Sequence, residues 1–370
     1  MNKIFEKGGK FYWLHSTVDA FETFLHVPGT VTRKGSHVRD AIDLKRLLIL
    51  VVIAAAPAAL FGMWNVGYQH GLAVGDLRLN ILGNFWYGFL RVLPLYLVSY
   101  IVGLGIEFAS CQIRGEEVSE GYLVSGFFIP LIVPVDIPLW MLAVAVAFAV
   151  IFGKEVFGGT GMNIVNPAIL ARAFLFFSYP NYMSGSSCWI HYKPTEQLVD
   201  GFTGATPLAL DGPAQYGTGF WDLFIGTVPG SVGETSVIAI LLGAAILLWT
   251  GIASWKIMCG SIAGALLVGW IGNVAGVTEI PFYMQLLYGG FAFGTVFMAT
   301  DPVTSCQTEC GKWIYGLLIG MLCITVRLFN PGYAEGMMLA ILLMNTFAPL
   351  IDHCVTSVHI NRRFRKLNAA

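Results

Sequence analysis

Three acidic residues of this 370-residue sequence stand within or at the end of apolar stretches. Glu107 lies inside one stretch, while Asp301 and Asp352 close two others. A carboxylate at membrane depth is costly unless it is partnered, so such residues are candidates for function. Carboxylate oxygens are hard ligands that suit a Na+ entry site, although they serve H+ as well. For Asp301 and Asp352, the alternative is that each is simply solvated at a helix end.

Two phenylalanines, Phe293 and Phe297, are four residues apart in an apolar stretch. On a helix this spacing places both rings on the same face. A pair of rings can form a hydrophobic constriction that gates an ion path by dewetting. Ordinary packing in the core or against lipid is the alternative interpretation.

Small and polar residues are concentrated in the segment 154–168. Gly158 and Gly159 allow the backbone to approach another group closely, or allow tight packing of helices. Asn163 and Asn166 are three residues apart and therefore share one face of a turn. Because buried amides need hydrogen-bond partners, the two asparagines predict either contacts with a bound group or hydrogen bonds between helices.

A polar loop contains the sequence Asp-Gly-Phe-Thr-Gly-Ala-Thr at residues 200–206. Its candidate binding residues are Asp200, Thr203, Gly204, Ala205 and Thr206. A threonine flanked by small residues is sterically open, so a modifying enzyme could reach the Thr206 hydroxyl. The alternative is an ordinary glycine-rich turn.

Apolar stretches supply the elements that must position these residues. Hydrophobic residues make up 56% of the chain and charged residues only 12%, whereas a soluble domain has about 25% charged residues. The chain is also too apolar to be disordered, and its net charge of -1 does not suit a general nucleic-acid binder. Roughly 20 apolar residues span a bilayer. Ten stretches are candidates, of which the third and the fifth are short: 47–65, 92–111, 121–135, 138–153, 164–178, 236–254, 257–275, 282–300, 312–329 and 336–353. The predicted fold is an all-α integral membrane protein.

The placement of Lys and Arg predicts the orientation. With ten spans both termini lie on one side, and that side carries 16 of the 21 cations. The positive-inside rule then places both termini in the cytoplasm and the Thr206 loop outside. Ten helices also divide into two sets of five with opposite topology, the inverted-repeat arrangement of many transport proteins. The predicted organisation is a cytoplasmic segment 1–46, a first repeat 47–178, an exterior loop 179–235, a second repeat 236–353 and a basic tail 354–370.

The loop at 200–206 matches an Asp-x-x-Thr-Gly-Ala-Thr signature. Through this signature the chain resembles one family, which is formed by the NqrB subunits of Na+-translocating NADH:quinone oxidoreductases and the homologous RnfD subunits of Rnf complexes. The resemblance extends from about residue 8 to residue 366 and includes the segments 154–168, 298–303 and 335–342. The basic segment 36–46 resembles the NqrB branch in particular. The chain departs from the family where Leu104 follows Gly103, a place where the family tends to have two glycines.

The resemblance implies a role for each candidate residue. A flavin transferase would attach FMN to Thr206 through a phosphoester, and Asn163 and Asn166 would contact a noncovalent riboflavin. His37, Arg39 and Gly103 would border a quinone site. Na+ would follow the three acids and the two phenylalanines. The few scattered cysteines suggest no metal site.

The resemblance also implies the function of a membrane flavoprotein subunit in the bacterial inner membrane. Electrons would pass from FMN to riboflavin to quinone, coupled to Na+ export. No nicotinamide-binding motif is present, so the chain would work only with the other subunits of a six-subunit NADH:quinone reductase and would hold no catalytic residue for NADH oxidation. Two alternatives remain: the RnfD subunit of an Rnf complex, and a channel or transporter without redox function.

Overall fold

The computed structural model describes residues 18, 35, 44–75, 80–115, 118, 121–184, 188–192, 199, 203–209, 219–330 and 335–369, and every regular element within them is helical. Six helices there are long and apolar enough to cross a membrane: α2 (Leu44–Val74), α3 (Ile81–Arg114), α5 (Leu139–Gly153, with the following turn η2, Glu155–Phe157), α11 (Trp255–Val274), α13 (Glu309–Phe329) and α14 (Met337–Ala369). Three apolar helices are shorter: α4 (Tyr122–Ile132), α6 (Pro167–Ser178) and α10 (Val237–Trp249). The prediction of an all-α membrane protein is therefore confirmed.

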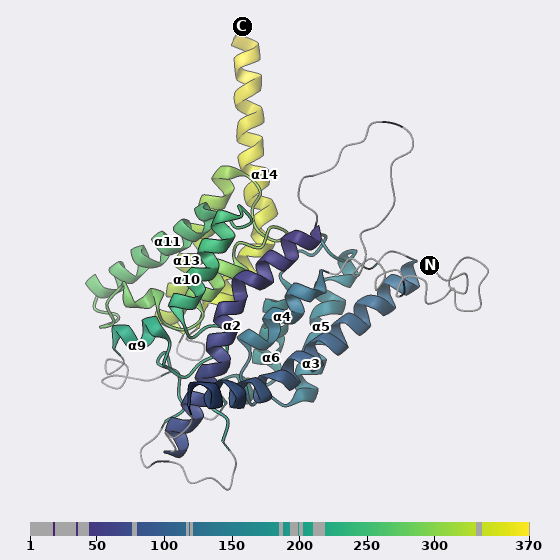
Figure 1. Ribbon diagram of the computed structural model, residues 1–370. Helices are drawn as coiled ribbons and strands as arrows, with labels where there is room; N and C mark the ends of the chain where they lie inside the picture. The colour runs from purple at the N-terminus through teal and green to yellow at the C-terminus, as the bar shows by residue number, and fades with distance from the viewer. Residues whose placement is uncertain are drawn as a thin grey trace, which may run out of the picture.

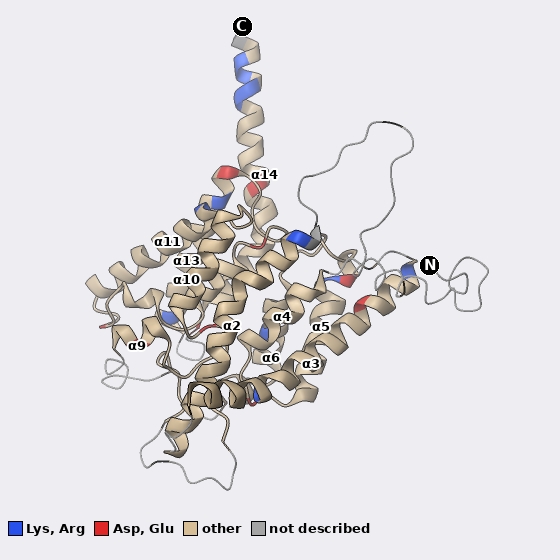
Figure 2. Cartoon of the chain, viewed as in Figure 1, with Lys and Arg blue, Asp and Glu red and all other residues tan. Residues whose placement is uncertain are grey.

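The helices form two groups that are joined by α2 (Figure 1). One group contains α3, α4, α5 and α6, and the other contains α10, α11, α13 and α14. Helix α2 packs against α3 in the first group and against α10 in the second. The C-terminal part of α14 projects from the body, and Figure 2 shows blue residues along it.

The expectation of a single helix across 282–300 is wrong. This stretch contains a 3-10 turn η3 (Met284–Leu286), a short helix α12 (Phe291–Phe293) and a π-helical turn η4 (Gly294–Met298). Between η3 and α12, Gly289 adopts a left-handed backbone with φ +56°, which prevents a continuous helix. A π-helical turn is rare and frequently occurs at functional sites.

Two helices extend well beyond their apolar stretches. The apolar stretch that predicts α2 ends at residue 65, yet the helix continues to Val74. The continuation is possible because its buried amides have partners: Asn65 donates to the Val228 carbonyl at 2.9 Å, and Gln69 donates to the Thr227 carbonyl at 3.0 Å. Helix α14 likewise continues through the basic segment to Ala369.

Small residues allow the helices to approach closely. On α3 the buried positions recur every three or four residues and include Ser99, Gly103 and Glu107. In the second group, a Cβ on Gly320 of α13 would overlap the Ser261 carbonyl of α11. Close contacts of this kind between small residues are typical of membrane helices.

Candidate functional site

A cavity of about 330 Å³, which we call the Asn163 cavity, lies between the start of α2, helix α4 and the segments 154–167 and 297–303. Several residues predicted from separate motifs meet in its lining: Asn163, Asn166, Phe297 and Asp301. The walls are mostly apolar, and Ser125, Thr160 and Thr300 add hydroxyl groups. An apolar pocket with a few convergent polar groups is typical of a small-molecule site.

Asn166 and Asp301 are held in place by hydrogen bonds. The Asn166 Oδ1 accepts from the backbone N–H of Ala168 at 2.9 Å, which caps the N-terminus of α6. Its Nδ2 donates to Asp301 Oδ2 at 3.2 Å. The same Asp301 oxygen accepts from Thr304 Oγ1 at 3.0 Å. Asn166 therefore connects the start of α6 to the segment that follows η4.

Asn163 is less constrained, since its Nδ2 donates to the nearby Val165 carbonyl at 3.1 Å. Gly158 and Gly159 have left-handed backbones, with φ of 115° and 96°. They form the turn before Asn163, and neither is among the residues that line the cavity. Their structural role is therefore the turn itself.

The three predicted acids have three different environments. Asp301 lines the Asn163 cavity. Glu107 is fully buried, and its Oε1 lies 2.5 Å from the Nζ of Lys154, which is only 3% exposed. Asp352 belongs to α14, and its carboxylate reaches the N-terminus of α13, where its Oδ2 accepts from the Gln307 N–H at 2.7 Å and its Oδ1 from the Thr308 N–H at 3.0 Å.

Of the three residues predicted to border a quinone site, only Gly103 lies within the described part of the chain. Gly103 lies on the buried face of α3, where a Cβ would overlap the ring of Tyr122. The Tyr122 hydroxyl in turn donates to the Ser99 carbonyl at 3.0 Å. His37 and Arg39, together with Asp200 of the threonine loop, lie outside the described residues.

A third ring joins the two predicted phenylalanines. Phe293 and Phe297 have ring centroids 5.0 Å apart. Phe128 of α4 packs against both, with centroids 5.9 Å from Phe293 and 5.8 Å from Phe297. We call these three buried rings the Phe cluster. Phe128 and Phe297 also line the Asn163 cavity, so the cluster forms part of the cavity wall.

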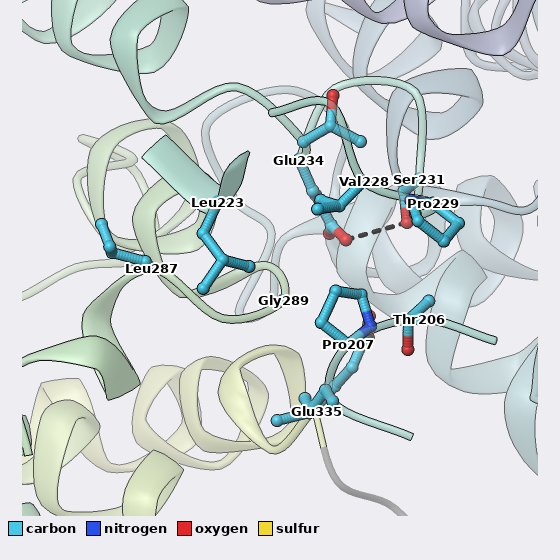
Figure 3. A pocket seen from close by; sticks show the side chains of 13 residues that line it. Thr206, Pro207, Leu223, Val228, Pro229, Ser231, Glu234, Leu287, Gly289 and Glu335 are labelled. Atoms are coloured by element: carbon cyan, nitrogen blue, oxygen red, sulfur yellow. Dashed lines mark hydrogen bonds between the residues drawn. The ribbon is translucent and has the colours of Figure 1, made fainter. Parts of the chain in front are cut away.

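Thr206 lies at a second, smaller hollow of about 30 Å³, which we call the Thr206 pocket. Figure 3 shows Glu234 and Ser231 on one side of it, and Thr206, Pro207 and Glu335 on the other. Thr206 is half-buried. In the loop before it, Thr203 is exposed, Gly204 is buried and Ala205 is half-buried; the Ala205 N–H donates to Thr203 Oγ1 at 3.3 Å.

A buried arginine holds the two acids of this pocket. Arg172 of α6 is 2% exposed; its Nη1 lies 2.5 Å from Glu234 Oε1, and its Nη2 contacts Glu335 Oε2. Ser231 Oγ donates to Glu234 Oε2 at 2.8 Å. We call Arg172, Glu234 and Glu335 the Arg172 triad.

The two regions are separated by the Phe cluster. Gly233, next to Glu234, has its backbone N–H bonded to the Leu131 carbonyl at 2.8 Å. A Cβ on Gly233 would lie 3.0 Å from the Phe293 ring. The Asn163 cavity, the Phe cluster and the Thr206 pocket therefore follow one another through the protein.

The sequence analysis missed Phe128, Glu234 and Glu335 as members of these sites. A signal existed for the two acids, because Arg172 stands in an apolar stretch and needs buried acidic partners. No comparable signal marks Phe128 among 26 phenylalanines. Among the described residues, no group of three His, Cys, Asp or Glu side chains is placed to hold a metal ion.

Known proteins resemble this chain over almost its whole length. The family described as "NQR2, RnfD, RnfE family" matches residues 31–361. The NqrB subunit of the Na(+)-translocating NADH-quinone reductase of Ectopseudomonas mendocina is 45% identical, covering 98% of this chain and 96% of the relative. The corresponding subunits from Stutzerimonas stutzeri and Chromohalobacter salexigens are each 43% identical over 98% of this chain, covering 96% and 94% of their own lengths. The chain belongs to the NQR2, RnfD and RnfE family.

Proposed function

We propose that the chain is the NqrB subunit of a Na+-translocating NADH-quinone reductase, a membrane flavoprotein that couples electron transfer to Na+ export. The relatives of that name match it over nearly their full length. One structural observation carries the ion-pumping part of the proposal. Two candidate cofactor regions, the Asn163 cavity and the Thr206 pocket, lie on either side of a packed cluster of three rings. Such a cluster between two regions would supply the barrier that controlled ion passage requires.

The proposed topology has ten spans in two inverted repeats of five. The six long helices, the three shorter ones and the segment formed by α12 and η4 would supply them. Helix α4, which is short, is third in the first set, and the interrupted α12–η4 segment is third in the second, so each repeat has a short or interrupted element at the same place. Interrupted elements in matching positions are typical of transport sites. Both termini would face the cytoplasm of a bacterial cell, with the Thr206 loop outside.

The residues present fit two flavins. An apolar cavity of about 330 Å³ is within the usual range of ligand pockets, and the Asn163 amide would offer a polar group to a flavin ring. Thr206 is half-buried at the rim of its pocket, where a flavin transferase could reach its hydroxyl. When bound, FMN and riboflavin would supply the electron-transfer chemistry that the side chains themselves lack.

The chain's own residues would bind and orient these groups and control the ion path. Asn163 and Asp301 would contribute polar groups to the cavity wall, and the Phe cluster would exclude water between the two regions. Gly103 would border the quinone site together with His37 and Arg39. Electrons would have to come from other members of the complex, because the chain has no nicotinamide-binding motif.

Covalent flavin on Thr206 is the part of the proposal that can be tested most directly. We expect the protein, coexpressed with a flavin transferase, to give a fluorescent band on a denaturing gel. Thr206→Leu should abolish that fluorescence while leaving the size-exclusion profile unchanged. Thr227→Leu is the matched control, since Thr227 is a half-buried threonine outside the 200–206 signature, and it should keep the label.

Two results would contradict this assignment. Fluorescence that persists in Thr206→Leu would place the flavin on another residue. A dark band from the unaltered protein, while the same transferase labels a control substrate, would exclude a covalent flavoprotein and favour a channel or transporter.

A further inference from the structure

We propose that residues 353–369, the part of α14 that projects from the helix body, form a docking helix for another subunit of the complex. We call this part the α14 extension. Its partner would be a groove with an apolar floor and an acidic rim on the cytoplasmic side. The inference goes beyond the proposed function and rests on it only for the existence of the complex and for the cytoplasmic side.

The α14 extension leaves the body of the protein at Asp352. The carboxylate of Asp352 still accepts hydrogen bonds at the start of α13. Beyond it, every described side chain from Val358 to Asn368 is exposed, and Figure 1 shows the helix continuing out of the body. At 1.5 Å per residue, Leu367 lies roughly 22 Å beyond Asp352. The extension therefore presents its side chains to whatever surrounds it.

One face of the extension is apolar. Ile360, Phe364 and Leu367 are 47%, 60% and 72% exposed. Their spacing of four and three residues places them on the same side of the helix. We call these three residues the Phe364 stripe. A stripe of large apolar side chains with this spacing is what a helix presents to a hydrophobic groove.

The rest of the extension is strongly basic. Four cations surround the Phe364 stripe: Arg362, Arg363, Arg365 and Lys366. Figure 2 shows blue residues along this part of the helix. No Asp or Glu follows Asp352 in the sequence, so no acid of the extension neutralises them. A surface that covers the extension must therefore supply the negative charge.

The course of the helix favours a protein groove over a membrane surface. A basic amphipathic helix can lie flat on an anionic bilayer. Here that would require a sharp bend after Asp352, and sharp bends in helices are typical of Pro and Gly positions. Residues 353–369 contain neither, and Pro349 lies before Asp352 within α14. The unbroken helix holds the Phe364 stripe roughly 12–22 Å beyond Asp352, away from the bilayer.

Site-specific photocrosslinking in the purified complex tests this contact. The photoreactive amino acid p-benzoylphenylalanine replaces Phe364 in the full-length chain, and mass spectrometry identifies the crosslinked peptide. We expect one other subunit to be crosslinked, through a peptide that carries both apolar and acidic side chains. The same probe at Val358 is the matched control. Val358 is 53% exposed but lies on the opposite face of the helix, so most of the product should be lost.

Limited digestion with trypsin gives a second readout, because trypsin cleaves after the arginines and the lysine of the extension. Phe364→Glu places a charge on the apolar face and should release the helix from its groove. We expect cleavage of the extension to become roughly tenfold faster than in the unaltered complex. Val358→Glu adds the same charge to the opposite face and should leave the cleavage rate unchanged.

The inference is overturned if the probe at position 364 crosslinks to lipid, to a second copy of this chain or to nothing. Equal crosslinking from positions 364 and 358, or equal cleavage rates in Phe364→Glu and Val358→Glu, would also overturn it. Failure of the proposed function would be a different result. In that case the chain would purify without other subunits, and Thr206 would carry no flavin.

Discussion

Among the described residues, two ion-paired groups that contain a buried cation differ in charge balance and in the kind of cation. Lys154 and Glu107 form a neutral pair within the first group of helices. The Arg172 triad holds two carboxylates on one guanidinium, which leaves one formal negative charge. The pair depends on a lysine with a flexible stem, whereas the triad depends on an arginine, whose planar fork fixes both partners.

The two groups also connect different parts of the chain. Lys154 and its partner Glu107 are 47 positions apart, and both belong to the first group of helices. Arg172 joins α6 to Glu234, 62 positions away, and to Glu335, 163 positions away. The triad therefore fastens the two helix groups together beside the Thr206 pocket. This contrast indicates one group that acts within a single helix group and one that holds the two groups together.

Arg172→Met should cause the largest loss of stability, because it removes the cation of the Arg172 triad. It removes the shared ion-pair partner of the buried Glu234 and the half-buried Glu335, and we expect the free energy of unfolding to fall by about 3–5 kcal/mol. Thermal unfolding of the purified complex in detergent would measure the loss. Adding Glu234→Gln to Arg172→Met should recover part of it. Undiminished stability of Arg172→Met would show that the triad does not hold the two helix groups together.

Phe128→Leu tests whether the Phe cluster separates the Asn163 cavity from the Thr206 pocket. Leucine keeps most of the packing, so the free energy of unfolding should fall by only about 1 kcal/mol. The narrower side chain should weaken the closure between the Asn163 cavity and the Thr206 pocket. Passive Na+ leak into proteoliposomes, measured without an electron donor, should rise several-fold. Phe127→Leu on the same helix is the control, since Phe127 is only partly buried and is not one of the three rings. An equal leak in both variants would refute a barrier at Phe128.

The smallest effects are expected from substitutions of the two other predicted acids, Asp301 and Asp352. Asp301→Asn removes a charge from the cavity wall and should raise the Na+ concentration needed for half-maximal quinone reduction. Asp352→Asn should raise it less, because Asp352 accepts hydrogen bonds at the start of α13 and does not line the cavity. Its main effect should be a loss of about 1 kcal/mol in stability. Sodium titrations of both variants would check the order, and a larger shift in Asp352→Asn would reverse it.

Much of the fold could be predicted, because crossing a bilayer leaves a local mark on the sequence. Apolar stretches indicated α5, α11 and α13 to within a few residues. The helix ends were harder, since α3 begins at Ile81, eleven residues before its predicted span. The stretch 282–300 was mistaken for one helix, because apolarity alone does not distinguish a continuous helix from short elements buried in protein.

The candidate sites were predictable to a lesser degree. Motifs indicated Asn163, Asn166, Asp301 and Phe297 separately, and the structure brings all four to one cavity. The partner of Glu107 could not be identified, because nothing local to residue 107 indicates which cation will face it. The same holds for Phe128, whose role depends on contacts with rings about 165 positions later in the chain.

By itself, the sequence determined that this chain lies in a membrane and which residues are too polar for their surroundings. A shortage of charge, apolar stretches of suitable length and the threonine loop are all local properties. Only the tertiary structure decided how the charges pair: Lys154 with Glu107, and Arg172 with two acids. The physical reason is that a buried charge must find a partner wherever the packed helices bring one, and that choice depends on contacts between distant parts of the chain.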